Sequence, residues 1–324
     1  MDVTSNLLKE IEEKIQSIPY PQYPEGLYEP IQYVLVAGGK RIRPMLTLLG
    51  YNLYREDVNN ALPVALAIEL YHNHTLLHDD LMDSADMRRG RPTVHKKWDE
   101  NTAILSGDTM LIMSVRLLLS MNCVRKEELL ELVVRTMNEV CEGQQYDVNF
   151  ENRDNVSEEE YIEMIRLKTS VLLACSLKAG AIAANAPNGD CKILYDFAER
   201  IGLAFQLQDD FLDVYGDPAI FGKNIGGDIL CGKKTYLLIK ALTQASELEK
   251  KQLLAYLYDK EMDAQIKIKE VTHLYNKLGV PVMCQDKINS LYAEASELLA
   301  ALSLPNTKKE LLWQYLSSLL GRKS

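Results

Sequence analysis

Hydrophobic residues recur at intervals of three and four along most of the chain, which is the spacing of one face of an α-helix. The segment 129–140 is a clear example, and no proline occurs between Pro92 and Pro187. Runs of alternating β-branched residues, which would indicate strands, do not occur in the sequence. The pattern predicts an all-α protein of about ten to thirteen helices.

Several helix ends can also be predicted. The segments 157–160 and 307–310 fit the capping box, in which a hydroxyl and a glutamate bind free amides of the first helical turn. The segments Asn188-Gly189 and Gly279-Val280-Pro281 are typical of helix stops. No linker-like or low-complexity segment separates these elements, so we expect residues 1–324 to form a single domain.

Aspartates form the same five-residue pattern, Asp-Asp-x-x-Asp, at 79–83 and again at 209–213. Residues i and i+4 of a helix lie on one face about 6 Å apart, so the outer aspartates of each copy point the same way. Both copies lie in apolar surroundings, where carboxylates are costly to bury without partners. A lone copy is more often a solvated acidic patch. Two copies favour a metal site.

Magnesium suits such carboxylate pairs, because it binds one or two carboxylates, keeps several waters and takes its other oxygens from phosphates. Two aspartate-rich helices on opposite sides of a cavity would therefore hold a diphosphate through Mg²⁺.

The net charge of the chain limits the partners that it can bind. The formal net charge is −10, which argues against nucleic acid as a partner, while 47% hydrophobic and 25% charged residues are typical of a globular protein. An acidic protein must hold an anionic substrate through metal ions and locally placed cations.

Cysteine usage and hydropathy indicate a cytoplasmic protein. The six cysteines are scattered without a C-x-x-C pattern, so we expect reduced, mostly buried thiols. The charged N-terminal segment 1–15 does not resemble a signal peptide, and Lys178 interrupts the most apolar stretch, 170–187. We therefore expect no membrane insertion.

Basic residues gather near the acidic motifs, as arginine forks and lysine point charges do at phosphate sites. Each cluster alone is more often a solvated surface. The clusters are Gly38-Gly39-Lys40-Arg41-Ile42-Arg43, Arg88-Arg89-Gly90-Arg91, Arg166 with Lys168-Thr169, Gly222-Lys223 and Gly232-Lys233-Lys234-Thr235.

The ordered motifs GGKRIRP, HDDLMDSADMRRGRPT, LKT, FQLQDDFLDVYGD, GK and GKKT resemble the trans-isoprenyl diphosphate synthase (polyprenyl synthetase) family. The resemblance runs from about residue 30 to 240. It implies the all-α isoprenoid synthase fold, with a central cavity between the two aspartate-rich helices. It also implies a homodimer and two or three Mg²⁺ ions, or Mn²⁺ in their place.

The resemblance also assigns roles to single residues. The metal ligands it implies are Asp79, Asp83 and Asp209, with Asp80, Asp210 and Asp213 supporting them in catalysis. The residues it places on the allylic diphosphate are Arg88, Lys168, Thr169, Gln206, Lys223 and Lys233, of which Lys168 also counts as catalytic. The residues it places on isopentenyl diphosphate are Lys40, Arg43, His72 and Arg89. Asn224 is one residue more than the family pattern has after Lys223.

The expected reaction is a head-to-tail condensation. Metal ions and cations stabilise the departing diphosphate of a dimethylallyl, geranyl or farnesyl diphosphate, and isopentenyl diphosphate attacks the allylic cation. A proton is then lost to the departed diphosphate.

Four other functions stay open: a long-chain polyprenyl diphosphate synthase, a class I terpene cyclase, a non-catalytic synthase subunit and a phosphate-binding protein. His78-Asp79 alone is weak support for a metal-dependent hydrolase.

Product length is expected to depend on side chains upstream of Asp79 on the same helix. Tyr71, Thr75 and Asp79 share a face at i+4 spacing, and His74 lies beside them. In the family, a bulky residue five positions before the first aspartate accompanies short products. A ring of medium size at His74 therefore predicts a C15 to C20 product, farnesyl or geranylgeranyl diphosphate. Alternatively, Tyr71 and His74 only fill the core.

Overall fold

The computed structural model describes residues 3–217 and 225–320. The chain divides into two compact units, and each is discontinuous in sequence. Unit 1 comprises Met1–Met137 and Cys175–Tyr195, and unit 2 comprises Asn138–Ala174 and Asp196–Ser324. The prediction of a single domain over 1–324 stays a prediction.

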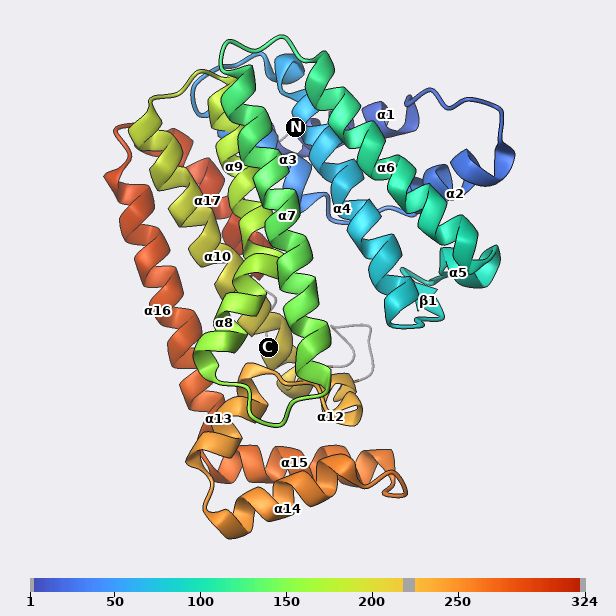
Figure 1. The fold of residues 1–324 in the computed structure, drawn as a ribbon. Coiled ribbons are helices and arrows are strands. Elements are labelled where there is room, and N and C mark those ends of the chain that lie inside the picture. Colours follow the sequence, from blue (N-terminus) through green and yellow to red (C-terminus); the bar gives the residue numbers. More distant parts are fainter. Residues whose placement is uncertain (1–2, 218–224, 321–324) are drawn as a thin grey trace. The chain divides into compact units, whose positions relative to one another are not determined.

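Unit 1 is built from helices and one very short β-hairpin (Figure 1). Its elements are α1 (Val3–Gln16), α2 (Glu25–Val36), α3 (Ile42–Asn52), the 3₁₀ turn η1 (Val58–Asn60), α4 (Leu62–Met82), β1 (Met87–Arg88), β2 (Arg91–Pro92), α5 (Val94–Lys97), α6 (Glu100–Ser120) and the first half of α7 (Lys126–Glu151). Parts of α9 and α10 complete it.

Unit 2 is helical throughout its described residues. Its elements are the second half of α7, α8 (Glu158–Ile165), the π-helical turn η2 (Arg166–Ser170), the start of α9 (Val171–Ala183), most of α10 (Asn188–Tyr215), α12 (Gly227–Cys231), α13 (Tyr236–Gln244), α14 (Glu247–Tyr258), α15 (Ala264–Lys277), α16 (Val280–Ala301) and α17 (Asn306–Leu320).

Helix α4 forms the centre of unit 1. It is buried on most sides, and Val64, Ala67 and Ile68 are completely inaccessible to solvent. The small side chain of Ala67 lets α6 approach closely, and Ser114 Oγ of α6 donates a hydrogen bond to Ala67 O at 2.6 Å. A helix enclosed in this way presents its C-terminal end in a fixed position.

The core of unit 2 is a cluster of aliphatic and aromatic residues from α8, α10, α13, α14, α15 and α16. Lys267 is buried beside this cluster, and its Nζ donates to Leu257 O at 3.2 Å and to Asp259 O at 2.6 Å. These carbonyls lie at the C-terminal end of α14, where a helix leaves acceptors unpaired. The lysine therefore fastens α15 to α14.

The all-α prediction is confirmed for the described residues, whose only strands are β1 and β2 of the short hairpin in unit 1. Sixteen α-helices are present there, more than the ten to thirteen expected. The excess arises because elements such as α5 and α12 are only four and five residues long, too short for a periodic pattern to reveal.

Two of the four predicted helix ends are confirmed. Ser157 and Glu160 form a reciprocal capping box, and Gly279 adopts a left-handed conformation directly before α16. The other two predictions are wrong. Thr307 lies inside α17, which begins at Asn306, and α10 already begins at Asn188. The break before α10 lies at Asn185, a non-glycine residue with φ of 60°.

The cysteines are free thiols, as expected, but only three of them are buried. Cys141 and Cys231 are exposed, so the expectation that most would be buried is wrong. By length and composition alone α6 could cross a membrane, a test that core helices of soluble proteins also pass.

Candidate active site

The first aspartate motif lies at the C-terminal end of α4 in unit 1. Asp79 is partly buried, Asp83 is exposed and ends the helix, and Asp80 is buried between them. The amide of Asp83 donates to Asp79 O at 2.9 Å, which closes the last helical turn. The outer aspartates are thus fixed by a helix whose N-terminal and middle turns are enclosed in the core.

A tight hairpin holds the two arginines that follow the motif. Its central residues Arg89 and Gly90 both have positive φ, of 52° and 73°, as a type I′ turn requires. Arg88 Nε lies 2.8 Å from both carboxylate oxygens of Asp80. Tyr33 of α2 donates from its hydroxyl to Pro92 O at 2.9 Å. The hairpin is therefore tied to both α4 and α2.

The four residues expected to bind isopentenyl diphosphate are brought together in unit 1. Lys40, Arg43, His72 and Arg89 line one cavity of about 450 Å³. The guanidinium of Arg89 donates to Gly38 O and packs over Gly39, where an added Cβ would lie 2.8 Å from it. The cavity therefore collects cations from a loop, a helix and a hairpin.

The positively charged Arg43 and the neutral His72 form a hydrogen-bonded pair at the wall of this cavity. Their Nη1 and Nε2 atoms are 3.0 Å apart, and because arginine can only donate, His72 accepts through Nε2. Burial and the neighbouring Arg43 hold the pKa of His72 well below its usual range, so the imidazole is neutral. Arg43 Nε is buried without a partner among the described atoms. Because His72 accepts without a charge, the positive charge of Arg43 is not neutralised by this pair.

The second aspartate motif lies near the C-terminal end of α10 in unit 2. Asp209 is exposed, Asp213 is partly buried, and Asp210 is buried. Asp210 is held by the hydroxyl of Tyr161 and by Gln206 Nε2 at 3.1 Å. Burial raises the pKa of Asp210 to about 7. Its role is therefore to anchor α10 and Gln206.

A π-helical turn positions the next two predicted residues. Within Arg166–Ser170, Lys168 Nζ lies 2.6 Å from Asp147 Oδ2 of α7, and Thr169 Oγ1 donates to Gln206 Oε1 at 3.1 Å. Helix α7 approaches this turn at Gly143, where an added Cβ would lie 2.2 Å from the amide nitrogen of Lys168. Only glycine fits at this crossing.

Two carboxylates that lie beside the predicted lysines Lys168 and Lys233 were not predicted from the sequence. Asp147 pairs with Lys168, and Asp228 Oδ1 lies 4.0 Å from Lys233 Nζ. Burial raises the pKa of Asp228 to about 6, and repulsion by Asp213 and Asp209 adds to this effect against the attraction of Lys233. A signal was available for Asp228, which follows the two glycines 226–227 and precedes the GKKT motif. Asp147 had no local motif.

Asp213 is connected to Asp228 through the backbone. Its Oδ2 accepts from the amide of Asp228 at 2.9 Å, which fixes the start of α12 next to the second motif. Lys223, also predicted for the allylic diphosphate, and Asn224 lie outside the described residues.

The carboxylates fit a divalent ion that is completed by a substrate. Among residues 3–217 and 225–320, no three His, Cys, Asp or Glu side chains are close enough to enclose an ion by themselves. Mg²⁺ does not need such a cage, since it retains waters and phosphate oxygens. Asp213 and Asp209 repel the Asp228 carboxylate and add to the rise in its pKa that burial causes, so several carboxylates of unit 2 lie close together at the motif. A cation there would relieve this repulsion.

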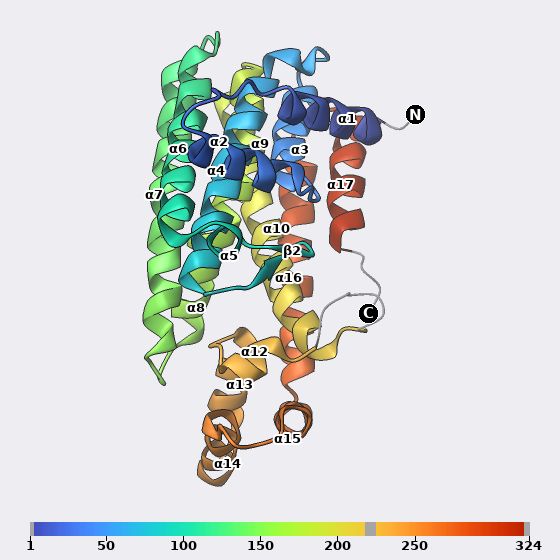
Figure 2. The same ribbon diagram turned by 90° about the vertical axis from the view of Figure 1, so that its right-hand side faces the viewer.

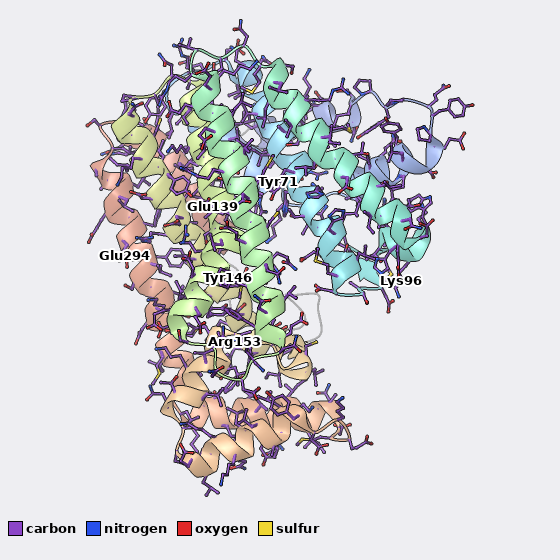
Figure 3. All side chains as sticks on the ribbon, in the orientation of Figure 1. Tyr71, Lys96, Glu139, Tyr146, Arg153 and Glu294 are labelled. Carbon is purple, nitrogen blue, oxygen red and sulfur yellow. The ribbon has the colours of Figure 1, made fainter. Side chains whose placement is uncertain are left out.

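The predicted chain-length residues occupy the buried middle of α4. Tyr71, labelled in Figure 3, donates from its hydroxyl to Met137 O of α7 at 2.9 Å. The Tyr71 and His74 rings are 5.7 Å apart, and His74 packs edge-on against His78. Thr75 Oγ1 donates a hydrogen bond to His72 O at 2.8 Å. Their role in product length stays a prediction.

Comparison with known proteins identifies relatives over most of the chain. The polyprenyl synthetase family model matches residues 24–275. A short chain isoprenyl diphosphate synthase of Methanocaldococcus jannaschii is 43% identical over 264 residues, covering 81% of this chain and 80% of the relative. A geranylgeranyl pyrophosphate synthase of Geoglobus acetivorans is 43% identical over 251 residues, or 76% and 78% of the two chains.

A solved structure shares the whole fold. The crystal structure of a geranylgeranyl pyrophosphate synthase, 42% identical in sequence, covers 100% of both chains with a TM-score of 0.94. The predicted isoprenoid synthase fold is thereby confirmed.

Proposed function

This chain belongs to the polyprenyl synthetase family, and we propose that it is a trans-prenyltransferase that condenses isopentenyl diphosphate with an allylic diphosphate to give a C15 to C20 prenyl diphosphate. The observation that carries the proposal is the cavity of unit 1, where four predicted diphosphate ligands from separate segments meet. Relatives named as short-chain and geranylgeranyl synthases support the product length.

In this proposal, the residues of unit 1 bind and orient isopentenyl diphosphate. Lys40, Arg43 and Arg89 supply the positive charge, and neutral His72 holds Arg43 in place at 3.0 Å. Arg forks bind diphosphate oxygens in pairs, which fixes the direction of the attached double bond. Asp79 and Asp83 provide carboxylates for a divalent ion.

The residues of unit 2 act on the allylic diphosphate. Lys168, Thr169, Gln206 and Lys233 offer donors to it, while Asp209 offers a carboxylate to a divalent ion. Bound Mg²⁺ would neutralise charge on the departing diphosphate. The C–O bond of the allylic substrate breaks, the double bond of isopentenyl diphosphate forms the new C–C bond, and a proton passes to the released diphosphate.

A single assay tests this function. The protein is incubated with labelled isopentenyl diphosphate, Mg²⁺ and, in parallel, dimethylallyl, geranyl or farnesyl diphosphate, and the products are separated by chromatography. We expect an acid-labile C15 or C20 diphosphate. A hydrocarbon would indicate a terpene cyclase, much longer chains a polyprenyl synthase, and absence of product a non-catalytic subunit.

We also propose that the protein is a cytoplasmic homodimer associating through α6. The free thiols support a cytoplasmic location, because disulfides are rare in that compartment. On α6, Leu105, Ile112 and Leu119 follow at intervals of seven, and each is more than half exposed. Asp108 and Arg116 are exposed four positions on either side of Ile112. An antiparallel pair of α6 helices centred on Ile112 would place each aspartate against the arginine of the other copy.

Light scattering after gel filtration tests the homodimer. Ile112→Glu is expected to give a monomer, while the matched change Leu248→Glu, at an exposed leucine of α14, should leave a dimer. Asp108→Arg should weaken association, and the added Arg116→Asp should restore it. A wild-type monomer, or a dimer unaffected by Ile112→Glu, would contradict this interface.

A further inference from the structure

One cation of the unit 1 cavity is not available to a diphosphate. Arg41 lines the cavity together with Lys40, Arg43 and Arg89, yet its side chain is completely buried and engaged at every side. Its Nη1 donates to Glu69 Oε1 at 2.7 Å, its Nε to Glu12 Oε1 at 2.8 Å and its Nη2 to Leu35 O at 2.6 Å. Burial favours the neutral form of Arg41, but the two glutamates outweigh it and raise the pKa.

The backbone of Arg41 is equally unusual. Its φ and ψ of 49° and 38° are left-handed, a conformation that side chains other than glycine rarely adopt. This turn follows Gly38 and Gly39 and leads directly into α3. Such a conformation persists only where surrounding contacts enforce it. The three guanidinium contacts supply that enforcement, and they thereby set where Lys40 and Arg43 emerge.

The acceptors come from three helices of unit 1. Glu69 belongs to α4, is itself buried, and accepts a second hydrogen bond from Asn73 Nδ2 at 2.9 Å. Leu35 belongs to α2. Glu12 belongs to α1, which runs crosswise to α3 (Figure 2) and packs through Leu7, Ile11 and Ile15. The N-terminal helix is thus connected to the turn by one carboxylate.

We propose that Arg41 is a positioning residue for isopentenyl diphosphate, and that Glu12 makes α1 a working part of that binding site. This inference rests on the proposed function. It assigns a role to a helix that contributes no residue to the lining of the cavity. The guanidinium keeps the turn in the conformation that presents Lys40 and Arg43, and Glu12 keeps the guanidinium in place.

The direction in which one substitution changes the affinity for isopentenyl diphosphate distinguishes a positioning role from a purely electrostatic one. Removing the negative charge of Glu12 near an anion site would strengthen anion binding if only the net charge mattered. If Glu12 positions Arg41, its loss weakens binding instead. Glu12→Ala is therefore expected to raise KM for isopentenyl diphosphate about five- to tenfold, as loss of part of a charge-assisted contact does. KM for the allylic diphosphate should change less than about twofold.

Conservative and matched variants complete the test. Glu12→Gln keeps an acceptor for Arg41 Nε and should bind isopentenyl diphosphate as the wild type does. Glu13→Ala, at the neighbouring mostly exposed glutamate of α1, should have no effect. Arg41→Lys cannot reach three acceptors and should raise the same KM more than about tenfold. If Arg41→Lys fails to fold, the Glu12 variants still decide, because Glu12 is partly exposed.

Calorimetric titration with isopentenyl diphosphate measures the affinity without turnover. If the wild type does not bind it, the proposed function fails. If the wild type binds and Glu12→Ala binds equally well or more tightly, the proposed function stands and the positioning role is wrong. Equal rises in KM for both substrates would also overturn it.

Discussion

Arg88 shares its Nε hydrogen between both carboxylate oxygens of Asp80, at 2.8 Å from each. The middle aspartate of the first motif is therefore directed to a protein partner, while Asp83 remains exposed. The same division occurs in unit 2, where Asp210 is buried against Tyr161 and Gln206 and Asp209 is exposed. In each motif the middle aspartate anchors a neighbouring side chain, whereas one outer aspartate, Asp83 or Asp209, lies exposed to solvent.

Asp80→Asn should therefore impair the enzyme less than changes of the outer aspartates. The amide still accepts a hydrogen bond from Arg88 but loses the charge, so Arg88 should be held less firmly. We expect about a tenfold loss of kcat/KM for the allylic diphosphate. Steady-state kinetics with the allylic substrate varied would measure it. A loss as large as that of Asp79→Asn would show that Asp80 binds the metal itself.

Removal of divalent ions should abolish turnover and leave the fold intact. Excess chelator is expected to reduce product formation to background, Mg²⁺ to restore it, and circular dichroism to remain unchanged. Asp79→Asn and Asp209→Asn should each lower kcat/KM by about 100-fold or more, since each removes a contact to the ionising diphosphate. Asp286→Asn, an exposed aspartate of α16, is the control. Losses below tenfold in both motif variants would rule out this role.

The predicted cations should divide between the two substrates. Lys40→Ala is expected to raise KM for isopentenyl diphosphate about tenfold or more, and Lys233→Ala to do the same for the allylic diphosphate. The reason is that Lys40 lines the unit 1 cavity, whereas Lys233 faces Asp228 beside the second motif. Each variant is titrated against both substrates. Equal effects on both substrates in either variant would refute the assignment.

Product length should respond to the rings in the middle of α4. Replacing both Tyr71 and His74 by alanine is expected to lengthen the product by one or more isoprene units, and His74→Ala alone should show part of this shift. Tyr71→Phe is the matched control, because it removes only the hydrogen bond to Met137 O and keeps the ring. Products are compared by mass spectrometry after dephosphorylation. An unchanged product from the double variant, made at a similar rate, would show that other residues limit the product length.

Stability should decline in mild acid because of His74. Burial lowers the pKa of His74 to about 4, and its Nδ1 has no hydrogen-bond partner. Its pKa in the unfolded chain is about 6.5. The unfolded state therefore binds the proton more tightly, and the stability present above pH 6.5 is lost as the pH falls towards 4. This histidine should account for about 2 kcal/mol at pH 5.

Urea unfolding at pH 7.5 and pH 5 measures this loss. His74→Phe keeps a ring of similar size without the titration, so its stability should fall less between the two pH values. An identical decline in the wild type and the variant would assign the acid sensitivity to other groups.

Local sequence patterns predicted the parts of the site that depend on helix geometry. The i, i+4 spacing placed Asp79 and Asp83 at one helix end, and the cluster around Lys40 indicated a cationic site. The local charge pattern alone does not distinguish Arg41 from Arg43, and only the family resemblance selected Arg43; in the structure Arg41 is enclosed by glutamates, whereas Arg43 lines the cavity beside His72. That difference depends on Glu12 and Glu69, which approach the turn only through tertiary packing.

The same limit explains the other omissions. Asp147 becomes part of the site because Gly143 lets α7 approach Lys168, and nothing near it in sequence indicates this. The wrong helix ends have a local cause instead. Asn185 adopts the left-handed conformation that glycine more often adopts, so the glycine pattern at Asn188-Gly189 predicts the end of the helix too late.

The π-helical turn at Arg166–Ser170 restricts how this enzyme can change over evolutionary time. One surplus residue puts the helix out of phase by about 100° across that point. Arg166 pairs with Glu163 and Glu199, while Lys168 and Thr169 reach Asp147 and Gln206. A substitution can replace any one of these side chains, but it does not remove the surplus residue. Only the deletion of one residue would restore a regular α-helix, and that deletion would rotate Arg166 relative to Lys168 and Thr169 and separate them from their partners at once. Descendants of this sequence can therefore vary the identity of these residues far more easily than their number.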